Sequence, residues 1–145
     1  MLEAINLSKN YGNIKALNTL SFKVNKGEIF CLLGQNGAGK TTTINIFLGL
    51  LLPTAGEAFI NGISVTKQTK NRSKIAYIPE VIQLYSNLSA IENLDFFSRL
   101  AGYKYLKTEL FMFLNQSNLQ SKFFQKKLNT YSKGMRQKVG IAIAL

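Results

Sequence analysis

The residues of this 145-residue sequence with the clearest chemical meaning form a glycine-rich run at positions 34–42. The run reads G-Q-N-G-A-G-K-T-T and matches the pattern G-x-x-x-x-G-K-[ST]. Glycines let consecutive backbone N–H groups turn toward one anion, and a helix that follows adds the partial positive charge of its N-terminus. A glycine-rich turn without a ligand is the alternative. The residues expected to contact a nucleotide are Gly34, Asn36, Gly37, Ala38, Gly39, Lys40, Thr41 and Thr42.

Three side chains of this run have distinct expected roles. Lys40 is expected to reach the outer phosphates of a nucleoside triphosphate. The Thr41 hydroxyl is expected to ligate Mg²⁺, and the Thr42 hydroxyl to donate to a phosphate oxygen. The run therefore predicts a site for a nucleoside triphosphate with Mg²⁺.

The segments that flank the run have the order that such a loop requires. Residues 28–33 are a short apolar stretch bounded by glycines, which predicts a buried strand. Residues 41–51 have helical spacing and stop before Pro53. A strand, the loop and a helix are thus expected in direct succession.

The rest of the chain alternates between strand-like and helix-like segments, which predicts an α/β fold. Period-two patterns and the Asn61-Gly62 turn signal predict strands at residues 2–7, 20–24, 57–60, 63–65 and 75–78. Ser89 and Glu92 form a capping-box pattern that opens a predicted helix ending near Gly102. Further helices are expected at 106–119 and from Gly134 onward.

The composition excludes several kinds of site. The sequence has no histidine and one cysteine, Cys31, so it offers no histidine-dependent catalysis, no histidine metal site and no disulfide framework. The longest apolar runs, residues 46–52 and 139–145, are far shorter than the roughly 18 residues that span a bilayer. We expect neither an integral membrane protein nor, from the first residues, a secreted one.

The net charge of +11 favours anionic partners such as nucleotides. However, 15 of the 18 basic residues are Lys and 3 are Arg, and the arginines do not cluster. Arginine is the usual reader of bases and phosphates in nucleic acids. We therefore interpret most of the charge as solvated surface and do not expect a nucleic-acid partner.

Three further motifs give the sequence a specific resemblance. They are Tyr11-Gly12-x-x-x-Ala16-Leu17, then Tyr77-Ile78-Pro79-Glu80, then the stretch Y-S-K-G-M-R-Q-K at 131–138. Together with the glycine-rich loop, they resemble the nucleotide-binding domain of an ATP-binding cassette (ABC) transporter ATPase of the exporter type. The motifs correspond to the family's A-loop, Q-loop and signature. Glu80 replaces the usual Gln, and Lys133 and Met135 depart from the commonest signature.

The resemblance implies a role for each of these motifs. Tyr11 would stack on adenine, although a simple turn residue is the alternative. Glu80 would help to hold Mg²⁺, or would be a solvated loop acid. Ser132 and Gly134 would contact the γ-phosphate bound by a partner subunit, although a simple serine N-cap is the alternative.

The resemblance also implies an architecture and partners. The fold would be an α/β P-loop NTPase of the ABC type, with an N-terminal antiparallel β-region and a helical subdomain. Residues 1–80 would form the nucleotide-binding core, 81–130 the helical subdomain, and 131–145 the signature and the start of its helix. The partners would be a transmembrane permease subunit and a second ATP-binding subunit in a head-to-tail dimer. The protein would be cytoplasmic and peripheral on the inner face of the membrane.

Residues that the family uses for hydrolysis do not occur in this sequence. After the signature helix the family has an apolar strand ending in Asp-Glu (Walker B) and later a switch His, whereas Asp95 is the single Asp here. The chain thus resembles the N-terminal portion of an ATPase, truncated before the Walker B strand. No catalytic residue is assigned, and the isolated chain is expected to be inactive. The alternatives are a nucleotide-binding fragment without turnover, or a soluble ABC protein acting on nucleic acid or ribosomes.

Overall fold

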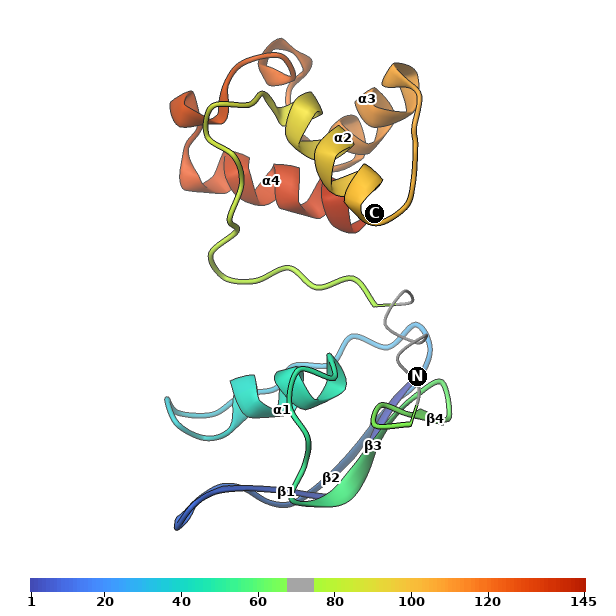
Figure 1. The fold of residues 1–145 in the computed structure, drawn as a ribbon, viewed down its shortest axis with the longest axis vertical. Coiled ribbons are helices and arrows are strands. Elements are labelled where there is room, and N and C mark those ends of the chain that lie inside the picture. Colours follow the sequence, from blue (N-terminus) through green and yellow to red (C-terminus); the bar gives the residue numbers. More distant parts are fainter. Residues whose placement is uncertain (68–74) are drawn as a thin grey trace. The chain divides into compact units, whose positions relative to one another are not determined.

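The structure is a computed structural model that describes residues 1–67 and 75–145 (Figure 1). The chain divides into two compact units, Met1–Ile75 and Ala76–Leu145. Each unit is a separate body of structure and has its own hydrophobic core.

A four-stranded antiparallel sheet with the strand order β2-β1-β3-β4 forms most of the first unit. The strands are β1 (Leu2–Tyr11), β2 (Ile14–Val24), β3 (Ala55–Ile60) and β4 (Ile63–Ser64). Asn61 and Gly62 have φ angles of 50° and 78°, as the tight turn between β3 and β4 requires. The predicted 57–60 and 63–65 hairpin is therefore confirmed.

The helix α1 (Lys40–Phe47) packs on this sheet. Ile46 and Phe47 join the apolar residues of three strands in one core, made of Ala4, Leu7, Leu17, Ile46, Phe47, Ala58 and Ile60. The helix ends earlier than the predicted residue 51. Gly49 has a φ of 67°, and the N–H groups of Gly49 and Leu50 donate to the carbonyls of Ile46 and Asn45, which is the Schellman arrangement.

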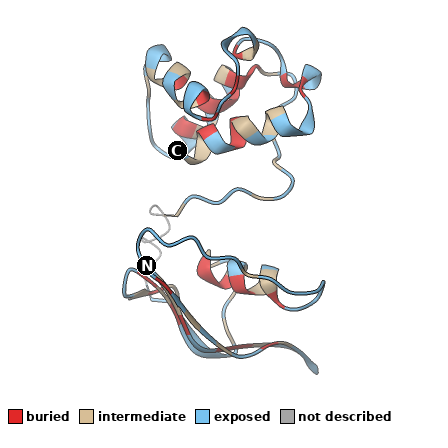
Figure 2. Cartoon of the chain, turned by 180° about the vertical axis from the view of Figure 1, so that it is seen from behind, coloured by how far each residue is buried: buried red, intermediate tan, exposed pale blue. Residues whose placement is uncertain are grey.

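Two of the predicted strands are wrong, because residues 28–33 and 75–78 have no regular secondary structure. Ile29 is 94% exposed and Leu33 is 87% exposed, so the segment before the loop is not buried (Figure 2). A strand forms only when its backbone groups pair with a neighbour. Within the described residues, the sheet has the order β2-β1-β3-β4, and neither segment is one of its strands.

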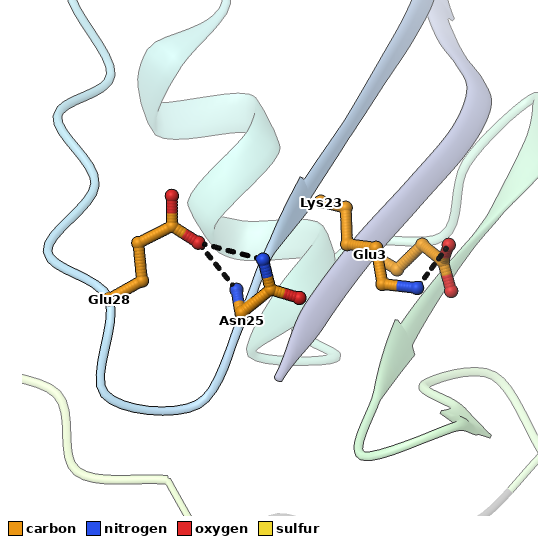
Figure 3. A network of polar contacts seen from close by, with 4 residues as sticks. All are labelled: Glu3, Lys23, Asn25 and Glu28. Carbon is orange, nitrogen blue, oxygen red and sulfur yellow. Dashed lines mark hydrogen bonds and ion pairs between the residues drawn. The ribbon is translucent and has the colours of Figure 1, made fainter.

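A local turn directs the chain away from the sheet after β2. Gly27 has a φ of 80°, and the Glu28 carboxylate accepts from the backbone and side-chain nitrogens of Asn25 at 2.7 and 3.3 Å (Figure 3). In the sheet itself, Glu3 on β1 pairs with Lys23 on β2 at 3.6 Å. The turn after β2 is thus held by its own polar contacts.

The second unit consists of three α-helices, α2 (Ala90–Leu100), α3 (Lys107–Gln116) and α4 (Lys133–Ala144). Two short 3₁₀ turns, η2 (Ser121–Phe123) and η3 (Leu128–Thr130), connect α3 to α4. The helices surround a core that Figure 2 colours as buried, made of Ala90, Leu94, Leu110, Leu114, Leu119, Phe124, Leu128, Tyr131, Val139 and Ala142.

The N-terminus of α2 confirms the predicted capping box. The Glu92 carboxylate accepts from both the backbone N–H and the hydroxyl of Ser89 at 2.7 Å. These hydrogen bonds, helped by Lys127, hold the pKa of the Glu92 carboxyl below its ordinary value. One turn later, the fully buried Asn93 side chain bonds both backbone groups of Tyr85, at 2.8 and 3.0 Å.

Helix α4 approaches the segment before α2 closely at one glycine. A Cβ atom built on Gly140 would lie 2.2 Å from Cδ1 of Ile82. A side chain at position 140 would therefore require the end of the Ile82 side chain to move. Among the described residues, none of the helices combines the length and apolar character that a membrane crossing needs.

Candidate nucleotide-binding site

The glycine-rich loop takes the conformation that its sequence predicts. Gly37 and Gly39 have φ angles of 86° and 84°, in the left-handed region that favours glycine. The Ala38 N–H donates to the Gln35 carbonyl at 3.1 Å, which closes a turn within the loop. Gly39 is the N-cap residue of α1 and Lys40 is the first residue of this helix. The loop therefore leads directly into a helix N-terminus.

The end of the loop is pressed against β2. A Cβ atom on Gly39 would lie 2.5 Å from the Ala16 carbonyl oxygen and 2.5 Å from Cδ2 of Leu17. By contrast, a Cβ atom on Gly37 would meet nothing within 4 Å. Gly39 is thus required by packing as well as by backbone conformation, whereas Gly37 leaves open space beside the loop.

The Lys40 side chain folds back over the loop. Its Nζ atom donates to the carbonyl oxygens of Gly34 and Gln35, both at 2.7 Å. The ammonium group is therefore held within the loop, next to the backbone that would surround a phosphate group.

The threonines of α1 divide between solvent and core. Thr41 is exposed and Thr42 is half-buried, so both hydroxyls are available to a ligand. Thr43 is buried, and its hydroxyl donates to the Gly39 carbonyl at 2.9 Å. This third threonine therefore holds the N-terminus of the helix rather than a ligand.

Tyr11 lies at the last position of β1, at the tip of the β1–β2 hairpin. The residue is exposed, with 48% of its surface accessible. The Lys9 Nζ atom lies over the Tyr11 ring, 5.3 Å from its centroid. Lys9 was not among the sequence candidates. The signal that could have found it is spacing, because residues two apart on a strand lie on the same face.

The predicted residues of the second unit are Glu80, Ser132 and Gly134. Glu80 is exposed in a bend after Pro79. Within residues 1–67 and 75–145, no three His, Cys, Asp or Glu side chains gather as a metal site. The metal-binding role of Glu80 therefore stays a prediction.

The signature stretch forms the start of α4. The Ser132 hydroxyl accepts from the Met135 N–H at 3.3 Å and caps the helix. A Cβ atom on Gly134 would meet nothing within 4 Å, so the fold does not demand a glycine there. Tyr131, just before the cap, donates its hydroxyl to the Phe123 carbonyl, and burial raises the pKa of its phenol. The open face of this helix N-terminus suits an approaching anion.

Comparison with known proteins decides the family. The sequence matches the ABC transporter family over residues 17–145. The chain belongs to the ABC transporter family.

Named relatives support this membership in the ABC transporter family. The chain is 37% identical to the linearmycin resistance ATP-binding protein of Bacillus subtilis and 38% identical to the bacitracin transport ATP-binding protein of Bacillus licheniformis. In each case the alignment covers 100% of this chain and 47% of the relative. The chain thus spans about half the length of these ABC relatives.

Solved ABC cassettes have the same fold. A dimeric ATP-binding cassette in a post-hydrolysis state, bound to ADP and Pi, matches with a TM-score of 0.83 and 29% identity. That match covers 100% of this chain and 69% of the cassette. An ATP-binding subunit of an ABC transporter matches with a TM-score of 0.80 and 34% identity, over 99% of this chain and 60% of that one. The predicted fold class, an α/β P-loop NTPase of the ABC type with an antiparallel sheet, is confirmed.

The first unit brings together the loop and the hairpin that carries Tyr11. Lys9 is paired with Leu17 across the strands, and Leu17 lies against Gly39. Glu80, Ser132 and Gly134 belong to the other unit. Tyr11, which is predicted to stack on adenine, and the glycine-rich loop thus belong to the same unit.

Proposed function

We propose that this chain carries the phosphate-binding and signature motifs of the ATP-binding subunit of an ABC transporter. In the whole protein, Mg-ATP bound between two such subunits in a head-to-tail dimer would be hydrolysed to drive transport through a transmembrane permease. The protein would lie at the cytoplasmic face of the membrane. The relatives named for bacitracin transport and linearmycin resistance support an export role.

The observation that carries this proposal is the loop that leads into α1. Its left-handed glycines, the Lys40 ammonium and the exposed Thr41 hydroxyl surround the N-terminus of a helix, which favours phosphate. We assign Mg²⁺ to the hydroxyl of Thr41, with Glu80 as a further candidate ligand. The functional division of the chain at residues 80 and 130 is also a proposal.

Titration of the 145-residue chain with ATP tests the phosphate site. Lys40→Ala is expected to abolish or strongly weaken binding, and Thr41→Ala is expected mainly to remove the dependence on Mg²⁺. Lys104→Ala is a suitable control, because Lys104 is an exposed lysine of the other unit. Equal affinities of the original chain and the Lys40→Ala variant would contradict the proposal.

A second candidate function is nucleotide binding without turnover, and Asp95 favours it. Asp95 is the single Asp of the sequence, and its carboxylate accepts from Arg99 at 2.8 Å on α2. Asp95 therefore lies within a helix, where its carboxylate is paired with Arg99, and does not follow an apolar strand. Transfer of the γ-phosphoryl group needs a positioned water and stabilisation of charge. Phosphate release by this chain is expected at background, and turnover that Lys40→Ala removes would contradict this reading.

A further inference from the structure

The Lys9 ammonium joins two parts of the first unit. It lies over the Tyr11 ring and also donates to the Leu52 carbonyl at 2.8 Å, in the segment after α1. The same segment is held by two more hydrogen bonds. The Asn10 N–H donates to the Thr54 hydroxyl at 3.0 Å, and the Thr54 N–H donates to the Ser8 carbonyl at 2.8 Å. The end of β1 is therefore anchored to the chain that leaves the loop helix.

The contact between Lys9 and Tyr11 matters because Tyr11 lies on the hairpin that packs against the phosphate loop. The ring is at the hairpin tip, and the hairpin contacts the loop through Ala16, Leu17 and Gly39. Figure 1 shows the β1–β2 hairpin and α1 in the same unit. A nucleotide whose phosphates lie in the loop would carry its base toward this hairpin, where Tyr11 is 48% exposed.

We propose that Lys9 is a positioning residue that holds the Tyr11 ring ready to stack against the base of a bound nucleotide. This inference rests on the proposed nucleotide-binding function. A cation over one face of an aromatic ring draws π-electron density toward itself. The opposite face then repels the π-electrons of a purine less, which strengthens offset stacking. Because the ammonium is also bonded to the Leu52 carbonyl, it restricts the directions that the ring can take.

The test compares two ligands that share phosphates but differ in the base. The 145-residue chain is titrated with ATP and with inorganic tripolyphosphate. Lys9→Met removes the ring contact, and Lys9→Arg keeps a cation over the ring. Lys15→Met is the matched control, because Lys15 is an exposed cation paired with Asn10 on the same hairpin. Thr54→Val is a second control, since it removes an anchor of the same segment without removing the cation.

The expected result is specific to the base. Relative to Lys15→Met, Lys9→Met should weaken ATP binding about two- to fivefold and leave tripolyphosphate binding unchanged. Lys9→Arg should restore ATP binding. In a Tyr11→Ala background, Lys9→Met should have no further effect on ATP relative to Lys15→Met. Circular dichroism and thermal unfolding of each variant show whether the fold is intact.

Three results would overturn the inference while leaving the proposed function in place. They are equal loss of ATP affinity in Lys9→Met and Lys15→Met, persistence of the Lys9 effect without Tyr11, and the same base-specific loss in Thr54→Val. A chain that binds neither ligand, or binds them independently of Lys40, would instead contradict the proposed function, and the inference with it. The two failures are therefore distinguishable.

Discussion

A Cβ atom built on Gly39 would lie 2.5 Å from the Cδ2 atom of Leu17, so the phosphate loop and the β1–β2 hairpin meet without room for a side chain. Real β-carbons essentially never come this close to a neighbour. The N-terminus of α1 can pack this closely against the hairpin because residue 39 has no side chain. Gly37 and Gly39 have similar φ angles, but only Gly39 is packed closely against the hairpin.

We expect Gly39→Ala to destabilise the chain more than Gly37→Ala. Both substitutions place alanine in the left-handed region, which costs about 1–2 kcal/mol. Gly39→Ala also forces the loop away from Ala16 and Leu17, and such overpacking adds about 1–3 kcal/mol. Urea unfolding of the two variants measures the difference. Equal midpoints would show that the loop does not rest on the hairpin as described.

The two serine N-caps should differ in their contribution to stability. Ser89 is 5% exposed and exchanges hydrogen bonds with Glu92, whereas Ser132 is exposed and accepts a single 3.3 Å bond. We expect Ser89→Ala to cost about 1–2 kcal/mol and Ser132→Ala about 0.5 kcal/mol. Thermal unfolding of both variants provides the comparison. A larger loss in Ser132→Ala would mean that its cap is the stronger one.

The contribution of Glu92 to stability should depend on pH. The folded-state pKa of this carboxyl is lowered, chiefly by the Ser89 backbone N–H, so the carboxylate stabilises the fold at pH values above its ordinary pKa near 4.5. The stabilisation is lost as the pH falls through the lowered pKa. We therefore expect Glu92→Gln to be less stable than the original chain at about pH 6, with the gap closing toward about pH 3.

Denaturant midpoints across that pH range, followed by circular dichroism, are the measurement. Glu109→Gln removes a carboxylate that accepts from the Leu106 N–H at 2.6 Å at the start of α3. Its unfolding midpoints show how a second helix-capping carboxylate behaves under the same conditions. A gap between Glu92→Gln and the original chain that stays constant over the whole range would contradict the assigned cause.

Gly134→Ala should separate stability from ligand binding. Gly134 lies in the first turn of α4 with open space around its Cβ position, so alanine is expected to raise stability by about 0.5–1 kcal/mol. If this face binds a partner's phosphate, the added methyl group should weaken nucleotide-dependent association of the chain. Thermal unfolding and analytical ultracentrifugation with ATP measure the two effects. Unchanged association would remove support for the proposed role of Gly134.

Local signals in the sequence predicted those parts of the fold that local interactions determine. The Asn61-Gly62 turn, the Ser89–Glu92 capping box and the glycine loop before α1 depend on neighbours a few residues away, and all three are present. Residues 28–33 have an equally clear apolar pattern but no strand. Pairing depends on a distant segment, which the pattern of the strand itself does not contain.

The candidate site also combines features that the local sequence predicts with features that depend on distant contacts. The backbone of the loop follows from its glycines, whereas the contact between Gly39 and Leu17 depends on how the hairpin packs. The spacing of Lys9 and Tyr11 could have indicated their contact, whereas the bond from Lys9 to the Leu52 carbonyl joins residues far apart in the sequence and could not be predicted. A side chain that works through tertiary contacts has no motif of its own.

Helix α4 contains two glycines, Gly134 and Gly140, whose surroundings differ. A β-carbon at Gly140 would require the end of the Ile82 side chain to move, whereas the Gly134 position is open. In a mutational scan that scores the abundance of the chain and its nucleotide-dependent association separately, bulky substitutions at Gly140 should lower abundance. If Gly134 contacts a partner's phosphate as proposed, substitutions there should leave abundance intact and weaken only the nucleotide-dependent association of the chain. Two glycines about 1.7 turns apart on the same helix are thus expected to differ in what a substitution disrupts.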